Sequence, residues 1–216
     1  MISAILLAVY IDELLPLLRQ SKLGCHVDKI FMGAQIFADD IFLLSGNVSG
    51  LQEMVNICAE FASRKNLKFG THMIPAKSKT KCIIFSNKKK DLKISRNIFL
   101  YGNPLPWVSH VKHLGNTLQN DNSMRIDVAI KRGASIGKVN SLLQEFHNIV
   151  PDLLIKLVNS FATSLTGSSV WDLTSKECEQ LYRSWNVTVR NVFKLNRTTH
   201  RNLIEPFSDT IEDGTI

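Results

Sequence analysis

The sequence predicts an α+β fold, in which a small antiparallel sheet backed by two helices is followed by an all-helical region. In residues 31–44, two apolar stretches rich in β-forming residues meet at a pair of adjacent aspartates, which is typical of a hairpin. After Asn120 the apolar residues recur at helical spacing in residues 127–146, 152–165 and 176–193. Strand-like and helical patterns are therefore segregated along the chain, as in α+β proteins.

The first part of the chain contains both helices that are expected to back the sheet. Residues 3–18 are dense in Ala, Leu and Ile and predict a buried helix that ends at the Pro16 break. Residues 48–66 have apolar side chains three and four positions apart, which predicts a second helix with Asn47 or Ser49 as its cap.

Short β segments fill the rest of the first part. Residues 67–69 and 81–85 predict strands on either side of a loop, and Lys88 to Lys90 predict a basic turn. A smaller β unit is expected to follow through Tyr101, Trp107 and Leu118. We expect one domain in residues 1–118 and a helical domain in residues 119–216, with a frayed tail at residues 208–216.

Composition limits the classes of protein to which the chain can belong. A hydrophobic content of 44% in 216 residues is enough for a sizeable core. The net charge of +7 suits a polyanionic partner such as nucleic acid, although many basic proteins have other roles. The 4 cysteines are scattered, with neither metal-binding nor disulfide-scaffold spacing, which favours a reducing intracellular location. No apolar run is long enough to cross a bilayer, and we expect no membrane partner.

Asp39 and Asp40 are adjacent carboxylates between apolar shoulders. Like charges in a partly buried site repel each other, and a divalent cation removes that cost. Mg²⁺ prefers carboxylate oxygens and keeps some of its waters, which leaves positions for substrate phosphates. The pair therefore predicts a site for Mg²⁺, or for Mn²⁺ in its place. The alternative is an ordinary turn in which each aspartate hydrogen-bonds its own backbone. The Phe and Ile residues on both sides favour the metal site.

The stretch GAQIFADDIFLLS at residues 33–45 resembles the catalytic hairpin of reverse transcriptases, often written [YF]xDD. Other segments resemble the same family, in the same order, in its non-LTR retrotransposon branch. They are ISAILLAVYIDELL, which resembles the end of the template-binding helix, LQEMVNICAEFASRKNLKF after the hairpin, KTKCIIF, HVKHLGNTL, which is similar to the primer grip, and SLTGSSVWDL with the later Trp185 segment, which resembles the thumb.

The resemblance implies a partial polymerase palm, with its catalytic hairpin and primer grip in residues 1–118, followed by an all-helical thumb. It also implies an RNA-directed DNA polymerase that joins a deoxynucleotide to a DNA primer on an RNA template. Asp39 and Asp40 would be the metal ligands, and Phe37 would pack near the primer end. The location expected for such an element is the nucleus or the cytoplasm.

Further roles follow from the resemblance. Lys79 would assist the developing pyrophosphate charge, although Lys77 competes for this position because the segment AKSKTK is longer than the family pattern. Leu114 and Gly115 would let the backbone approach the primer, or Gly115 would merely serve a turn or bulge. The remaining candidates for contact with nucleic acid are Arg125, Lys131 and Arg132, whose alternative is a solvated helix face, whereas Trp171 and Trp185 are expected in the core.

The family coordinates its metals with a third carboxylate on a strand before the template-binding helix. The 36 residues before Phe37 contain no matching strand, and the upstream fingers are also absent from this sequence. We therefore expect the chain alone to be inactive, with metal-dependent nucleotidyl transfer belonging to a longer parent. The alternative is a palm and thumb that bind nucleic acid without chemistry.

Overall fold

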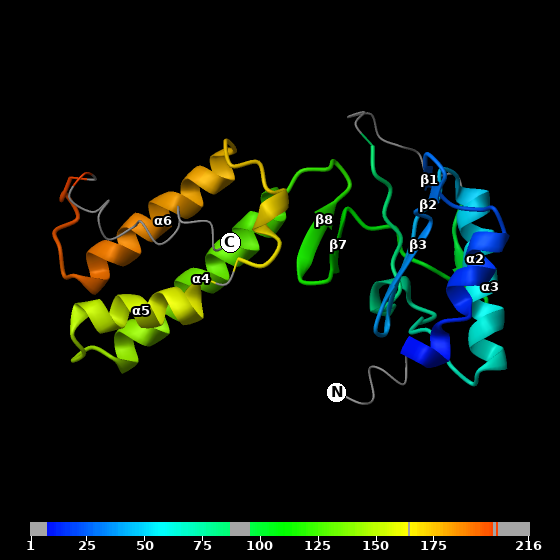
Figure 1. Ribbon diagram of the computed structural model, residues 1–216, viewed down its shortest axis with the longest axis horizontal. Coiled ribbons are helices and arrows are strands. Elements are labelled where there is room, and N and C mark those ends of the chain that lie inside the picture. The colour runs from blue at the N-terminus through cyan, green and yellow to red at the C-terminus, as the bar shows by residue number, and fades with distance from the viewer. Residues whose placement is uncertain (1–7, 87–95, 164, 201, 203–216) are drawn as a thin grey trace. The chain divides into compact units, whose positions relative to one another are not determined.

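The computed structural model describes residues 8–86, 96–163, 165–200 and 202 (Figure 1). The chain forms two compact units, Met1–Ser109 and His110–Ile216. Helices and small antiparallel sheets occur in the first unit, and a hairpin and a group of helices make up the second. The predicted α+β class is confirmed.

The helices α2 (Leu14–Gln20) and α3 (Val48–Arg64) pack together in the first unit. The expected end of the first helix at Pro16 is wrong. Residues 8–11 are helical, a turn follows at residues 12–13, and Pro16 lies in the first turn of α2. Proline is tolerated there because the first backbone N–H groups of a helix have no partner within it. The rest of the predicted helix, residues 3–7, lies outside the described residues.

The predicted helix after the hairpin is confirmed as α3, with Asn47 as its cap. The Asn47 side-chain oxygen accepts a hydrogen bond of 2.6 Å from the Gly50 amide, which satisfies one of the free donors of the first turn. The buried face of α3 holds Met54, Cys58 and Phe61, which share a core with Leu14 and Leu18 of α2.

The strands form four separate antiparallel pairs within the described part of the chain, not one joined sheet. Their bounds are β1 (His26–Val27), β2 (Ile30–Phe31), β3 (Ala34–Phe37), β4 (Asp40–Leu43), β5 (Phe99–Leu100), β6 (Asn103–Pro104), β7 (His110–His113) and β8 (Asn116–Gln119). Each strand pairs only with its neighbour in the sequence. The helices α2 and α3 contact β3 and β4, so the expected pair of helices backs the central hairpin.

The strands predicted at residues 67–69 and 81–85 do not form. Cys82 makes only an isolated parallel bridge with Trp107, and the 3-10 turn η1 (Pro75–Lys77) lies in the loop between the two segments. Leu67 and Phe69 pack against the cores of this unit, so their apolar character reflects burial without strand pairing. The basic turn expected at residues 88–90 lies outside the described residues.

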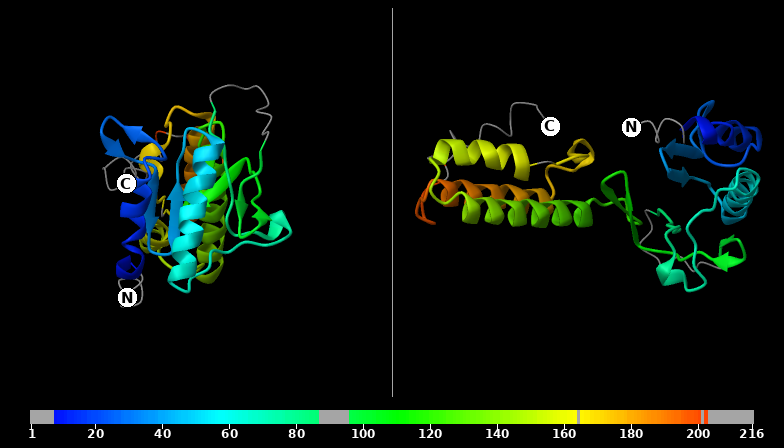
Figure 2. Two further views of the ribbon diagram at one scale, coloured as in Figure 1. Left: turned by 90° about the vertical axis from the view of Figure 1, so that its right-hand side faces the viewer. Right: turned by 90° about the horizontal axis from the view of Figure 1, so that it is seen from below.

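The second unit contains the three predicted helices, α4 (Arg125–Glu145), α5 (Pro151–Ala162) and α6 (Lys176–Val192), which pack on one another (Figures 1 and 2). Their shared core includes Val139, Val158 and Trp185. A second core, beside the 3-10 turn η2 (Ser168–Val170), holds Val128, Trp171 and Cys178. The expected frayed tail lies outside the described residues. No helix in the described segments combines the length and the apolar character needed to cross a bilayer.

The hairpin of β7 and β8 lies in the second unit, so the division between units comes earlier than the expected boundary at residue 118. The reason is contact with α4. The Thr117 amide in β8 donates a 2.8 Å hydrogen bond to the Asp127 carboxylate in α4, and β8 packs on this helix. Apolar patterning alone assigned the hairpin to the preceding β segments.

Candidate catalytic hairpin and nucleic-acid interface

The β3–β4 hairpin has one apolar face that packs on the helices and one open face. Alternate residues of a strand point to opposite faces of a sheet. The four residues of the packed face join the core made with α2 and α3. They are Ala34, Ile36, Ile41 and Leu43. The register pairs Ile36 with Ile41 and Phe37 with Asp40, which places Phe37 and Asp40 together on the open face.

The predicted hairpin is confirmed, with a small change in the position of the acids. The turn consists of Ala38 and Asp39, and Asp40 is the first residue of β4, opposite Phe37. Both aspartates are exposed, and the Phe37 side chain is 65% exposed. An aromatic ring and two carboxylates are therefore presented together at the tip of an otherwise apolar hairpin.

The side-chain contacts of these acids differ from those of other turn aspartates in the described residues. Asp121 and Asp172 show what turn aspartates do here: each accepts hydrogen bonds from the amide and the hydroxyl of the residue two positions later. These bonds, from Ser123 and from Thr174, lower the pKa of the two carboxyl groups. Within the described segments, no side-chain hydrogen bond or ion pair is found for Asp39 or Asp40. Their oxygens are thus free to accept a ligand.

The donor chemistry of the pair suits Mg²⁺, because unpaired carboxylate oxygens are the ligands that this cation prefers. The pair does not make a complete centre by itself. Across residues 8–86, 96–163 and 165–200, no group of three or more His, Cys, Asp or Glu side chains could hold a metal ion. A two-metal site at this hairpin therefore requires at least one carboxylate from elsewhere.

Lys79 and Lys77 are both exposed on the loop after α3. The base of this loop is closed by the Thr80 amide and hydroxyl, which each donate a 2.9 Å hydrogen bond to the Gly70 carbonyl. The aliphatic part of Lys79 lies against Gly70, where an added Cβ would come within 3.0 Å of Lys79 Cβ. Lys77 ends the short turn η1. Neither lysine forms an ion pair with Asp39 or Asp40 in the described residues.

The β7–β8 hairpin presents Leu114 and Gly115 at its tip. His113 pairs with Asn116, which leaves Leu114 and Gly115 as a two-residue turn with φ angles of 47° and 81°. The Leu114 side chain is 43% exposed, and no atom would obstruct a Cβ at Gly115. An exposed, sterically open turn is a surface that another backbone is able to approach closely.

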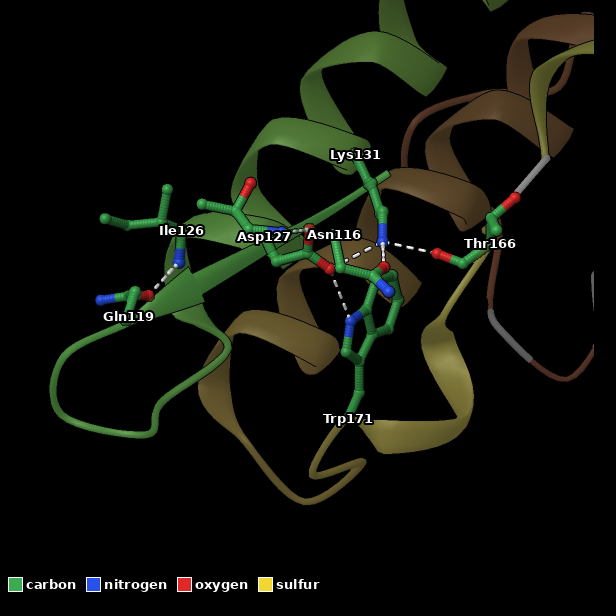
Figure 3. Close-up of polar contacts among 8 residues, drawn as sticks. Asn116, Gln119, Ile126, Asp127, Lys131, Thr166 and Trp171 are labelled. Atoms are coloured by element: carbon green, nitrogen blue, oxygen red, sulfur yellow. Dashed lines mark hydrogen bonds and ion pairs between the residues drawn. The ribbon is translucent and has the colours of Figure 1, made fainter. Parts of the chain in front are cut away.

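The three basic residues proposed to contact nucleic acid all have partners within the chain. Arg125 forms an exposed ion pair of 2.6 Å with Asp121. Arg132 donates a 2.8 Å hydrogen bond to Gln180 in α6. Lys131 is the most constrained, because its ammonium lies in a cluster of hydrogen-bond acceptors (Figure 3).

Sequence reasoning missed the centre of this cluster, Asp127. Its carboxylate is 2% exposed and accepts hydrogen bonds from Thr117, Lys131 and the Trp171 indole. The spacing of Asp127 and Lys131, four residues apart on one helix, was the available signal, but it usually marks a solvated pair. Trp171 and Trp185 are buried in cores, as predicted.

Comparisons of the chain with protein-family models, with curated proteins and with solved structures found no match.

Proposed function

We propose that this chain is the palm and thumb part of a non-LTR retrotransposon reverse transcriptase, an RNA-directed DNA polymerase. The observation that carries the proposal is the exposed Asp39 and Asp40 pair, which lacks internal partners at the tip of an apolar hairpin. Two adjacent, exposed carboxylates offer oxygens to a divalent cation, which would neutralise their charges. Phe37, on the same face as Asp40, provides an apolar surface for the end of a primer.

In this proposal the hairpin holds Mg²⁺ together with a third carboxylate in a longer parent. The bound metal ions would activate the primer hydroxyl and stabilise the leaving pyrophosphate. The ammonium group of Lys79, or that of Lys77, would lie near the triphosphate. The tip formed by Leu114 and Gly115 would contact the primer strand. Substrates of the parent are an RNA template, a DNA primer and deoxynucleotides.

A second candidate function is binding of nucleic acid without chemistry. One observation favours it: between Glu60 and Asp91 the sequence has no acidic residue, while Lys and Arg recur, with Lys77 and Lys79 both exposed. A segment of this kind attracts phosphates through release of counterions. Salt-dependent binding would then occur without any need for the aspartate pair.

Metal binding at the hairpin tests the first candidate. We expect purified chain to bind Mn²⁺ weakly, as measured by electron paramagnetic resonance, and the double variant Asp39→Asn, Asp40→Asn to lose this binding. The matched control is the double variant Glu53→Gln, Glu60→Gln, which removes two exposed carboxylates from α3. It should bind Mn²⁺ as the unsubstituted chain does. Equal binding by all three proteins would contradict the metal-site proposal.

Primer extension separates the two candidates. On an RNA template with Mg²⁺, we expect no product from the chain alone, because a site short of one ligand misplaces the nucleophile. If the unsubstituted chain made product and the Asp39→Asn variant made none, the chain would be complete enough to polymerise. Binding of a primer–template duplex that weakens with salt, with unchanged affinity in the double aspartate variant and no Mn²⁺ site, would favour the second candidate.

A further inference from the structure

A buried carboxylate in α4 is fully paired. Asp127 Oδ1 accepts a 2.8 Å hydrogen bond from the Thr117 amide. Its Oδ2 accepts from the Trp171 indole at 2.9 Å and from the Lys131 ammonium at 2.7 Å. A charge with 2% exposure needs such partners, because an unpaired buried carboxylate would be strongly destabilising.

The N–H donors of the Lys131 ammonium group also all have partners. An ammonium group has three N–H donors. In Figure 3, Lys131 Nζ points toward Asp127, the Asn116 side-chain oxygen at 2.7 Å and the Thr166 carbonyl at 2.5 Å. The same ammonium lies 5.3 Å from the centroid of the Trp171 ring. No N–H donor of Lys131 is left over for a phosphate.

The residues held by this network directly follow the tip of the β7–β8 hairpin. Asn116 and Thr117 begin β8, immediately after the exposed turn of Leu114 and Gly115. Further along the strand, the buried Gln119 side chain accepts a 2.7 Å hydrogen bond from the Ile126 amide, at the start of α4. Strand β8 is thus attached to α4 at both ends, and the tip has its orientation set by the helix.

We propose that Asp127 and Lys131 are positioning residues that hold the Leu114–Gly115 tip against α4 for contact with a nucleic-acid strand. This inference rests on the proposed function, since it assigns the tip a nucleic-acid partner. It replaces the expected role of Lys131 as a phosphate ligand. The ammonium acts through Asn116 and Asp127, and the tip makes the contact.

Gly167 provides an independent way to disturb the same network. Its φ of 81° and its position against the Asn116 side chain leave no room for a larger residue, since an added Cβ would overlap the Asn116 amide group. Gly167→Ala should therefore displace Asn116 without altering either charge. If Lys131 acts by positioning the tip, Gly167→Ala should disturb the tip in the same way as Lys131→Met, although it removes no charge.

The first measurement uses the free protein. In Lys131→Met we expect faster hydrogen exchange of the Thr117 amide and a shifted nuclear magnetic resonance signal of the Trp171 indole. The control Lys156→Met makes the same substitution at an exposed lysine on α5 and should leave both signals unchanged. Where Lys131→Met does not fold, the double variant Asp127→Asn, Lys131→Met removes both charges and takes its place. Unchanged signals in every network variant would overturn the inference.

The second measurement uses a primer–template duplex over a range of salt concentrations. Lys131→Met and Gly167→Ala should each weaken binding about tenfold. The dependence of binding on salt should stay the same as in the unsubstituted chain. Adding Leu114→Ala to either variant should cost little more, because the tip is already misplaced. A phosphate ligand behaves differently, since its loss lowers the salt slope by about one unit. That lower slope in Lys131→Met, with binding by Gly167→Ala unchanged, would overturn the inference.

The two proposals fail in distinguishable ways. If no duplex binds to the unsubstituted chain while the Thr117 and Trp171 signals still respond to Lys131→Met, the nucleic-acid function is wrong and the attachment of β8 to α4 stands. If duplex binds tightly and the network variants bind equally well, the positioning role is wrong and the proposed function remains.

Discussion

Two residues at hairpin tips adopt a backbone conformation that is unusual for their type. Ala38, in the turn beside Asp39, has a φ of 51°, and Leu114 has a φ of 47°. A left-handed conformation costs a residue with a Cβ about 1–2 kcal/mol relative to glycine. The same conformation occurs at Asp28 and Tyr101, in the turns of the β1–β2 and β5–β6 hairpins, so it follows from tight hairpin turns and does not by itself mark a functional site.

Replacing either residue with glycine should relieve this strain. We expect Leu114→Gly and Ala38→Gly each to raise the free energy of unfolding by about 1 kcal/mol, as measured by urea denaturation. Gly102→Ala is the reverse control, because Gly102 has a φ of 77° and open space around it, so alanine there should cost about 1 kcal/mol. A loss of stability in Leu114→Gly would show that the Leu114 side chain stabilises the free protein.

The buried thiols of the first unit predict a loss of stability at alkaline pH. Burial raises the pKa of Cys58 to about 12 and that of Cys82 to about 11, from an ordinary value of 9.0. Above pH 9.0 the unfolded chain releases these protons and the folded chain keeps them, so the folded state binds more protons.

We expect the thiol contribution to be fully present below pH 9.0 and to be lost as the pH rises toward 11 and 12. The loss should be about 1.4 kcal/mol per thiol for each pH unit in this window. Urea denaturation at several pH values measures it. Cys58→Ala and Cys82→Ala should start from lower stability and show a shallower decline than the parent chain. A decline that is unchanged in both variants would assign the effect to other groups.

At the scale of elements, the helices, the β3–β4 hairpin and the β unit through Tyr101 and Leu118 were predictable, and two further predicted strands were wrong. Helical signals are local: the apolar spacing that predicted residues 48–66 and the cap at Asn47 lie within α3 itself and were confirmed. Strands need partners far away in the sequence or a tight turn. The β3–β4 hairpin has such a turn and was predicted, whereas residues 67–69 and 81–85 are apolar without partners to pair with.

The residues of the candidate site were likewise predictable only where the signal is local in the sequence. Asp39 and Asp40 are recognisable because the acids, the turn and the apolar shoulders are adjacent in the sequence. The environment of Lys131 is not recognisable, because the groups that surround it come from distant positions. Trp171 lies 44 residues after Asp127, and Thr166 lies 35 residues after Lys131. A pair four residues apart on a helix is normally exposed, and only tertiary packing buries this one.

At the scale of the whole molecule, each unit has its own hydrophobic cores. Those of the first unit are built around α2, α3 and the β3–β4 hairpin, and those of the second around the three long helices and η2. A domain with a core of its own is able to fold alone. The position of the division then matters, because β7 and β8 supply partners to a buried charge in α4.

Two fragments test where the second unit begins. We expect residues 110–216 to unfold cooperatively in urea, with the Trp171 indole proton protected from exchange. Residues 119–216 lack Asn116 and Thr117, so Asp127 and Lys131 each lose a partner. Hydrogen bonds to charged groups contribute about 1.5–3 kcal/mol each, so the shorter fragment should be less stable by about 3 kcal/mol or more.

Asn116→Ala in the longer fragment removes one of the two lost bonds and should reproduce part of this difference. If the two fragments were equally stable, the β7–β8 hairpin would be energetically separate from α4, and the tip of Leu114 and Gly115 would have no rigid support. If only the longer fragment folds, the helix bundle and the hairpin form one unit. The buried charges that stabilise the fold would then also orient the tip for its proposed contact with nucleic acid.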